Sequence, residues 1–143
     1  MTKSLDEIKQ RHGSGQSPDP NLATEIDARQ KEGRLTCAKA HAIAETQSVA
    51  PHQVGKAMDL VGVRINRCQL GLFGYQPEKK VVKPVETVPE TLRAAIENKV
   101  QNGRIACAVC WAIADQQNRP RMAVAAACET MGVKISPCQL GAF

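Results

Sequence analysis

The chain has 143 residues, of which 43% are hydrophobic and 3% aromatic, and its formal net charge is +5. This mild positive charge is compatible with nucleic-acid binding but too small to indicate it. No apolar run has the length of a membrane span, and the first residues lack the apolar core of a secretion signal. We therefore expect a cytoplasmic protein without membrane contact. Its six cysteines would then be thiols, metal ligands or redox groups instead of structural disulfides.

The sequence contains the same module twice, at a spacing of 70 residues. Residues 22–73 align without gaps with residues 92–143 and give 20 identities in 52 positions. The segment Cys-Gln-Leu-Gly at 68–71 recurs unchanged at 138–141, and Cys37 aligns with Cys107. Internal repetition of this kind indicates two small domains of one fold.

The composition along the chain suggests where the repeats begin and end. Residues 1–21 are polar and show no sustained apolar periodicity, which predicts a flexible arm. The first repeat covers residues 22–75 and the second covers residues 89–143. Residues 76–88 between them contain two prolines and three lysines, which predicts an extended linker.

In chain order, each repeat predicts a helix, a short extended piece, two more helices and a second extended piece. The first helix covers residues 22–32 in repeat 1 and 91–102 in repeat 2. Gly33 and Gly103 follow these helices, and we expect them to be left-handed C-terminal caps.

The second and third helices follow the first extended piece. The second helix covers residues 37–47, capped by Thr36, and its counterpart covers 107–117. The third has about ten residues and ends at Gly62 or Gly132. Apolar and basic residues then alternate at 63–65 and 133–135, which is typical of half-exposed strands. We expect these strands to pair with the extended pieces, so that Ile65 lies beside Leu35 and Ile135 beside Ile105.

The two later helices of each repeat resemble the helix-turn-helix and winged-helix DNA-binding domains. In that motif an apolar residue and an alanine close one helix, a turn residue follows four positions later, and further apolar residues seat the recognition helix. The residues that fit this spacing are Ile43, Ala44, Ser48, Val49, Val54 and Ala57 in repeat 1, and Ile113, Ala114, Asn118, Val124 and Ala127 in repeat 2. The resemblance implies a mainly α fold with small β additions, built from two tandem three-helix, winged helix-turn-helix-like repeats. Residues 69–74 would form a stunted wing.

The resemblance also implies that the third helix of a repeat contacts DNA. In repeat 1 the outward residues of this helix would be polar, whereas in repeat 2 the same face carries Met122, Ala123 and Ala126. We therefore expect the binding of double-stranded DNA to depend more on repeat 1, and a protein partner to bind through repeat 2. The expected DNA-binding residues are His52, Gln53, Lys56, Arg64 and Arg67 in repeat 1, with Arg119 and Arg121 as phosphate contacts in repeat 2.

The cysteines have two interpretations. One is a zinc or iron–sulfur site, because Cys107 and Cys110 have the spacing of a metal-binding or redox pair and Cys128 and Cys138 could complete four ligands. A site shared between the repeats would instead use Cys37, Cys68, Cys107 and Cys138. The other interpretation is packing, since free cysteine is among the most buried residue types. In either case the paired extended pieces predict that Cys37 lies near Cys68 and that Cys107 lies near Cys138.

Catalytic constellations are not found in this sequence. No Ser-His-Asp set, phosphate-binding glycine loop or pair of carboxylates can be assembled from it, so we expect the protein not to be an enzyme. The sequence predicts a DNA-binding transcriptional regulator with two helix-turn-helix modules in one chain. The alternative is a protein-interaction or assembly module, with or without a thiol or metal site.

Overall fold

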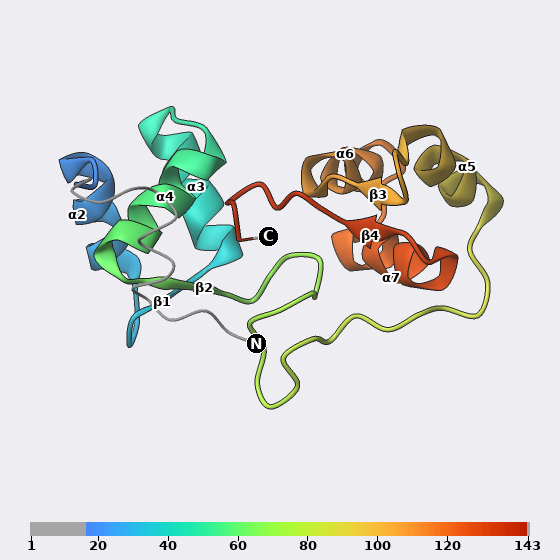
Figure 1. Ribbon diagram of the computed structural model, residues 1–143, viewed down its shortest axis with the longest axis horizontal. Helices are drawn as coiled ribbons and strands as arrows, with labels where there is room; N and C mark the ends of the chain where they lie inside the picture. The colour runs from blue at the N-terminus through green and yellow to red at the C-terminus, as the bar shows by residue number, and fades with distance from the viewer. Residues whose placement is uncertain (1–16, 143) are drawn as a thin grey trace. The chain divides into compact units, whose positions relative to one another are not determined.

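The structure is a computed structural model, which describes residues 17–142 (Figure 1). The chain divides into two compact units, with the boundary between Arg67 and Cys68. The described part of each unit consists of three helices and two short strands, so the expectation of a mainly α fold with small β additions is confirmed. Within residues 17–142, every helix is too short or too polar to cross a membrane.

Unit 1 follows the predicted order of elements. These are α2 (Pro20–Arg29), β1 (Arg34–Thr36), α3 (Cys37–Gln47), α4 (Pro51–Val61) and β2 (Arg64–Asn66). The Thr36 hydroxyl accepts a hydrogen bond of 3.2 Å from the Lys39 N–H, which confirms Thr36 as the cap of the second helix.

Unit 2 repeats this order, as the internal repeat predicts. Its elements are α5 (Glu90–Lys99), β3 (Arg104–Ile105), α6 (Cys107–Gln116), α7 (Arg121–Met131) and β4 (Lys134–Ile135). The third helix of each unit ends at a glycine in the left-handed conformation, Gly62 with φ 80° and Gly132 with φ 69°. The expected ends of both third helices are therefore confirmed.

Helix α2 begins earlier than the sequence pattern predicts. The Asp19 carboxylate accepts hydrogen bonds from the N–H groups of Asn21 at 2.8 Å and Leu22 at 3.2 Å, and Pro20 occupies the first helical position. The prediction that the flexible arm extends to residue 21 was therefore wrong for residues 19–21, and it stays a prediction for residues 17 and 18. Its remaining part, residues 1–16, lies outside the described residues.

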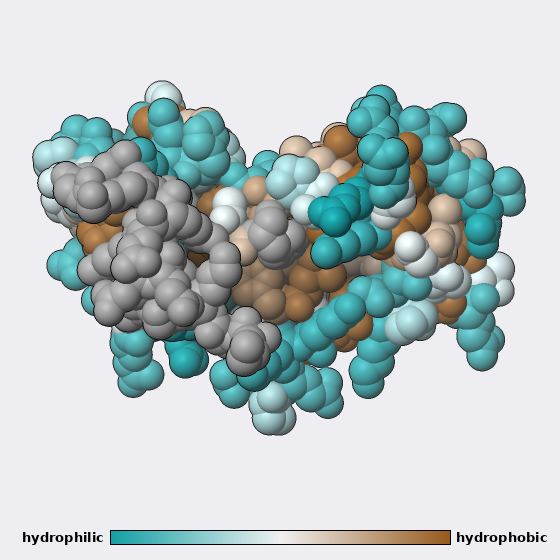
Figure 2. Space-filling view, in the orientation of Figure 1, coloured by the Kyte–Doolittle hydropathy of each residue, from teal (hydrophilic) through white to brown (hydrophobic). Residues whose placement is uncertain are grey.

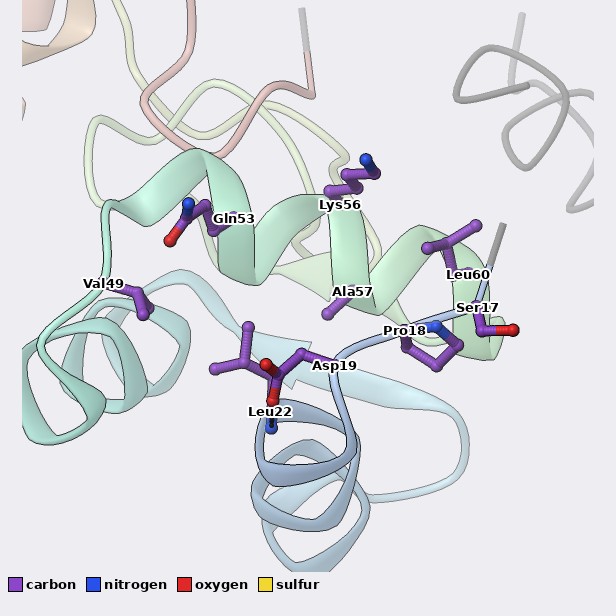
Figure 3. Close-up of a pocket in the computed structure, with 9 residues that line it drawn as sticks. All are labelled: Ser17, Pro18, Asp19, Leu22, Val49, Gln53, Lys56, Ala57 and Leu60. Carbon is purple, nitrogen blue, oxygen red and sulfur yellow. Dashed lines mark hydrogen bonds between the residues drawn. The ribbon is translucent and has the colours of Figure 1, made fainter. Parts of the chain in front are cut away.

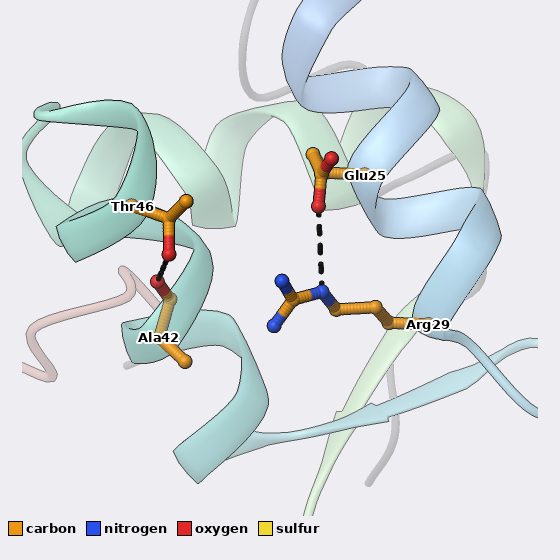
Figure 4. Close-up of polar contacts among 4 residues, drawn as sticks. All are labelled: Glu25, Arg29, Ala42 and Thr46. Atoms are coloured by element: carbon orange, nitrogen blue, oxygen red, sulfur yellow. Dashed lines mark hydrogen bonds and ion pairs between the residues drawn. The ribbon is translucent and has the colours of Figure 1, made fainter.

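Two polar contacts lie on the surfaces of α2 and α3 in unit 1 (Figure 4). The Arg29 guanidinium lies 3.4 Å from the Glu25 carboxylate one turn away, and the Thr46 hydroxyl donates to the Ala42 carbonyl oxygen at 2.8 Å. Because water still reaches and screens this partly exposed ion pair, it contributes little to stability. Hydrophilic residues cover much of the outer surface of each unit in the view of Figure 2.

A tight turn follows the first helix of each unit, and it changes the role of the predicted glycine cap. Helix α2 ends at Arg29, and Lys31 and Arg34 then exchange two backbone hydrogen bonds of 2.8 and 3.0 Å. The residues between them have positive φ, 54° for Glu32 and 77° for Gly33, which is the geometry of a two-residue type I′ turn. The prediction that Gly33 caps the helix was therefore wrong.

The same correction applies to unit 2. Helix α5 ends at Lys99, and the turn is formed by Asn102 with φ 53° and Gly103 with φ 74°. Asn-Gly is the residue pair that type I′ turns favour, because both residues tolerate positive φ.

The strands of each unit pair in parallel and in the expected register. Leu35 lies opposite Ile65 in unit 1, and Ile105 lies opposite Ile135 in unit 2. The strands are parallel because two helices carry the chain back between them, which a hairpin turn could not do. Residues 69–74 contain turns and bends but no strand, so they do not form the expected wing.

Residues 68–88 belong to unit 2, although we expected them to end repeat 1 and to form the linker. Leu70, Val82 and Val88 are buried in the same apolar core as Ile96 and Val124. The physical reason is that spaced valines and a leucine supply apolar surface that the three short helices of this unit can bury.

The turn at Gly103 leads to a test of stability. An alanine there would face no atom within 4 Å, but it would have to adopt a φ of 74°, so we expect Gly103→Ala to lower the free energy of unfolding by about 1–2 kcal/mol. Chemical denaturation monitored by circular dichroism would measure this loss. Asn102→Gly is the control, because glycine adopts positive φ readily and should leave stability unchanged or raise it. Equal losses in both variants would contradict the turn assignment.

Candidate functional site

Helices α3 and α4 join through a short left-handed turn. Ser48 has φ 56°, and the Val49 N–H donates to the Ala44 carbonyl oxygen at 3.0 Å. Only three residues separate Gln47, the last residue of α3, from Pro51, the first residue of α4. The positions expected to seat the two helices against the core are buried, namely Ile43, Ala44, Val54 and Ala57.

Unit 2 has the same turn geometry. Asn118 has φ 54°, and the Arg119 N–H donates to the Ala114 carbonyl oxygen at 2.9 Å. Ile113, Ala114, Val124 and Ala127 are buried like their counterparts. The small alanine at the end of each middle helix lets the next helix approach closely, which explains why this spacing recurs.

The outer face of α4 is polar. His52, Gln53 and Lys56 are exposed, as predicted, while Val54 and Met58 on the other face are fully buried. Beyond the helix, Arg64 is half-buried in β2 and Arg67 is exposed. Of the residues expected to contact DNA in repeat 1, those in α4 and Arg67 are therefore accessible to solvent. Arg64 is less accessible.

A shallow hollow of about 250 Å³ lies beside this face, between α4 and the segment that leads into α2 (Figure 3). Lys56 and Gln53 extend from α4 along its rim, and the Asp19 carboxylate on the opposite side is engaged in capping α2. The residues lining the hollow are Ser17, Pro18, Asp19, Leu22, Val49, Gln53, Lys56, Ala57 and Leu60.

Part of the equivalent face of α7, at its C-terminal end, contacts residues 80–85 of the same unit, while Met122 at its N-terminal end is exposed. The Thr130 hydroxyl accepts a 2.8 Å hydrogen bond from the Val85 N–H and lies 2.7 Å from the Val85 carbonyl oxygen. Lys80 forms an ion pair with Glu129 on the same helix. Residues 124–128 of α7 are all buried, including Ala126, which aligns with the exposed Lys56 of repeat 1.

The two arginines expected to hold phosphates in repeat 2 are engaged within unit 2. The Arg121 guanidinium lies 3.5 Å from the centroid of the Trp111 ring, and it donates to the Gln69 side-chain oxygen at 3.3 Å. Arg119 donates to the side chains of Gln117 at 3.0 Å and Thr91 at 3.3 Å. A phosphate would have to compete with these contacts, among them a cation–π interaction of about 0.5–2 kcal/mol.

Two of the cysteines expected in a metal site form a buried pair between α6 and α7. Cys110 donates a hydrogen bond to Cys128, and this bond, together with burial, raises the pKa of Cys110 far above its ordinary value. In repeat 1 the aligned positions are Ala40 and Met58, which are also fully buried. Cys110 and Cys128 therefore occupy core positions at which the other repeat has apolar side chains.

A second group of cysteines gathers where α6 begins. The Cys107 N–H donates to the Pro137 carbonyl oxygen at 3.0 Å, and the Gln139 side-chain amide lies 3.5 Å from the Cys107 sulfur. Burial raises the pKa values of Cys107 and Cys68. The backbone bond to Pro137 brings the next residue, Cys138, close to Cys107, as expected.

The four-cysteine set expected in repeat 2 is split by the structure into these two groups. Across residues 17–142, no three His, Cys, Asp or Glu side chains are already arranged to hold a metal ion. The sequence pattern did not indicate that Cys68 joins unit 2, nor that Gln139 contacts Cys107. Cys37 lies in unit 1, so its expected proximity to Cys68 stays a prediction, and so does a zinc or iron–sulfur cofactor.

Comparison of this chain with known protein families, with curated proteins and with solved structures gives no match.

The burial of the cysteines predicts an order of alkylation. Among the six, Cys138 is the one that is not buried, so we expect iodoacetamide to modify it first in the native protein. Peptide mapping by mass spectrometry after short exposure would identify the modified residue, and the denatured protein, in which all six thiols should react, is the control. Modification of Cys110 as fast as Cys138 would contradict the observed burial.

The contact between Thr130 and Val85 predicts how residues 80–88 are held on α7. Thr130→Val removes both hydrogen bonds to Val85, which are together worth about 0.5–1.5 kcal/mol at an exposed position. We therefore expect the Val85 amide to exchange with solvent hydrogen a few-fold to about tenfold faster, as measured by NMR. Thr87→Val, on the same segment, should leave this rate unchanged. An unaltered rate in Thr130→Val would show that other contacts hold the segment.

Proposed function

We propose that the protein is a transcriptional regulator that binds double-stranded DNA through α4 of repeat 1. The observation that carries this proposal is the amphipathic arrangement of α4. The helix follows a three-residue left-handed turn, buries Val54, Ala57 and Met58, and presents polar side chains on its opposite face. This is how a recognition helix is held in the helix-turn-helix fold, in which its N-terminal residues meet the base edges.

The side chains on this face have the chemistry for contact with a duplex. Gln53 carries both a donor and an acceptor, which suits a bidentate contact with adenine, and Lys56 one turn later is suited to a guanine edge or a phosphate. His52 lies beside Gln53 in the first turn of α4, and the exposed Arg67 adds a further positive charge after β2. The major groove is about 12 Å wide and admits one helix.

The charge of the two units implies how this binding responds to salt. The described part of unit 1 has seven basic and six acidic residues, and the described part of unit 2 has nine basic and six acidic residues. With so small an excess, few phosphates are neutralised, so we propose a modest salt dependence and a large contribution from base contacts. Repeat 2 would contribute less, because its third helix is partly covered and its two arginines are engaged.

The second candidate function is peptide binding by the third helix of a repeat, and one observation favours it. In unit 2, residues 80–88 lie along α7 through the Thr130 and Glu129 contacts. A partner protein could place an extended segment on the uncovered face of α4 in the same way. Lys56 at the centre of that face would favour an acidic segment.

The DNA proposal predicts the effect of changing two residues of α4. Gln53→Ala combined with Lys56→Ala removes a base contact and a phosphate contact, and we expect a loss of about 1–3 kcal/mol in binding free energy. A gel shift with duplexes selected from a random-sequence pool, at one fixed salt concentration, would measure it. The charge-matched control is Lys99→Ala, at the exposed end of α5, which should bind like the parent.

Two results would overturn this proposal. One is selection of no duplex by the parent protein. The other is a double variant that binds like the parent while Arg119→Ala with Arg121→Ala abolishes binding, which would assign DNA contact to repeat 2. If no duplex is selected but an extended acidic peptide protects α4 amides from hydrogen exchange, the second candidate is supported instead.

A further inference from the structure

The hollow beside α4 occupies a place that unit 2 fills with its own chain. Pro18 stands two residues before α2, lines the hollow and is half-buried. Val88 stands two residues before α5, at the same spacing of 70 residues, and is buried in the same core as Leu92. Leu92 in turn aligns with Leu22, which lines the hollow. The hollow is therefore a property of repeat 1 and not of the shared fold.

Unit 2 also has a polar tie at a position where unit 1 has a side chain of the hollow. The Arg119 guanidinium donates to the Thr91 hydroxyl at 3.3 Å, and the Gln117 side-chain amide donates to the Thr91 carbonyl oxygen at 3.1 Å. These bonds join the turn between α6 and α7 to the start of α5. Repeat 1 has Val49 at the position of Arg119, and Val49 lines the hollow. Because a valine side chain makes no such bond, it leaves apolar surface at this edge.

The hollow of unit 1 combines an apolar lining with one basic side chain. Leu22 and Ala57 are buried, and Val49 and Leu60 are half-buried around the hollow. Lys56 is exposed at its rim (Figure 3), and no carboxylate within residues 17–142 forms an ion pair with it. The flexible four-carbon stem of a lysine lets its ammonium group turn over the opening.

The acidic residue of the lining does not cancel this positive charge. The Asp19 carboxylate accepts hydrogen bonds from the N–H groups of Asn21 at 2.8 Å and Leu22 at 3.2 Å. The partial positive charge at the start of α2 offsets a negative charge in this position. Lys56 is therefore the charged group that the hollow offers to a ligand.

We propose that this hollow binds a small molecule with an apolar body and one carboxylate. The apolar body lies against Leu22, Val49 and Ala57, and the carboxylate pairs with Lys56. The volume of about 250 Å³ is smaller than that of pockets for drug-sized ligands, which hold about 300–1,000 Å³, so the ligand is smaller than these. Burial of the apolar body supplies most of the affinity, because an ion pair with an exposed lysine is weak.

The site shares Gln53 and Lys56 with the face of α4 that we propose to contact DNA. A carboxylate on Lys56 takes this side chain away from a phosphate or a base edge. The ligand then acts as an effector that opposes DNA binding, a consequence that rests on the proposed function. The binding site itself does not rest on it.

The test titrates the whole chain with three probes of equal chain length, namely hexanoate, 1-hexanol and hexylammonium. Methyl signals of Leu22, Val49 and Ala57 in NMR spectra report binding in the hollow. We expect hexanoate to bind about two- to fivefold more tightly than 1-hexanol, as an exposed ion pair allows, and hexylammonium to bind most weakly. Lys56→Met removes the charge at similar length. It should reduce the affinity for hexanoate to that for 1-hexanol and leave 1-hexanol binding unchanged.

Two further variants locate the site. Val49→Phe places a larger apolar side chain on the lining and should weaken the binding of hexanoate and 1-hexanol several-fold. The matched control is Val61→Phe, at an exposed position of α4 outside the lining, which should bind the probes like the parent. Circular dichroism would verify the fold of both variants.

Several results would overturn the proposal. These are no shift of the lining signals with hexanoate, equal affinity for hexanoate and hexylammonium, or undiminished binding in Val49→Phe. Hexanoate binding that occurs only after deletion of residues 1–16 would also overturn it, because the hollow would then belong to that part of the chain. None of these measurements includes DNA, so they can fail or succeed independently of the proposed function. The effector role is tested separately, by a gel shift in which hexanoate should weaken duplex binding more than 1-hexanol does.

Discussion

The parallel pairing of two very short strands is the constraint on which the rest of each unit depends. One strand immediately precedes the middle helix and the other follows the third helix. Their hydrogen bonds therefore join the start of the middle helix to the end of the third helix. In unit 2 the same closure continues past β4, where the Cys107 N–H meets the Pro137 carbonyl oxygen. The pairing thus fixes the end of the third helix relative to the start of the middle helix.

The two units share this framework but differ in what lies on the third helix. In unit 1 the helix presents Gln53 and Lys56 outward, whereas in unit 2 the aligned residues are Ala123 and Ala126, and an extended part of the chain packs over that helix. The polarity of the outer side chains therefore differs between the units together with the packing of other chain segments on the third helix. An exposed helix face needs polar residues to remain hydrated, and a covered face needs small apolar ones to permit close packing.

Local signals and the internal repeat made much of the fold predictable. The cap at Thr36, the glycines that end α4 and α7, and the pairing of Leu35 with Ile65 all follow from short-range chemistry and periodicity. The type I′ turns could have been predicted from Asn102-Gly103, but the glycines were interpreted as helix caps instead. The packing of residues 68–88 could not be predicted, because their apolar residues show no regular period and are buried through tertiary contacts.

The covering of α7 has a consequence for how the two halves of the chain can change over generations. At the buried Ala126 of α7 only a small side chain fits without displacing its neighbours. The aligned helix in the first half is under no such steric limit at Gln53 and Lys56, so it can exchange one polar residue for another at little cost in stability. The two copies therefore differ in how freely the outer residues of their third helices can be exchanged.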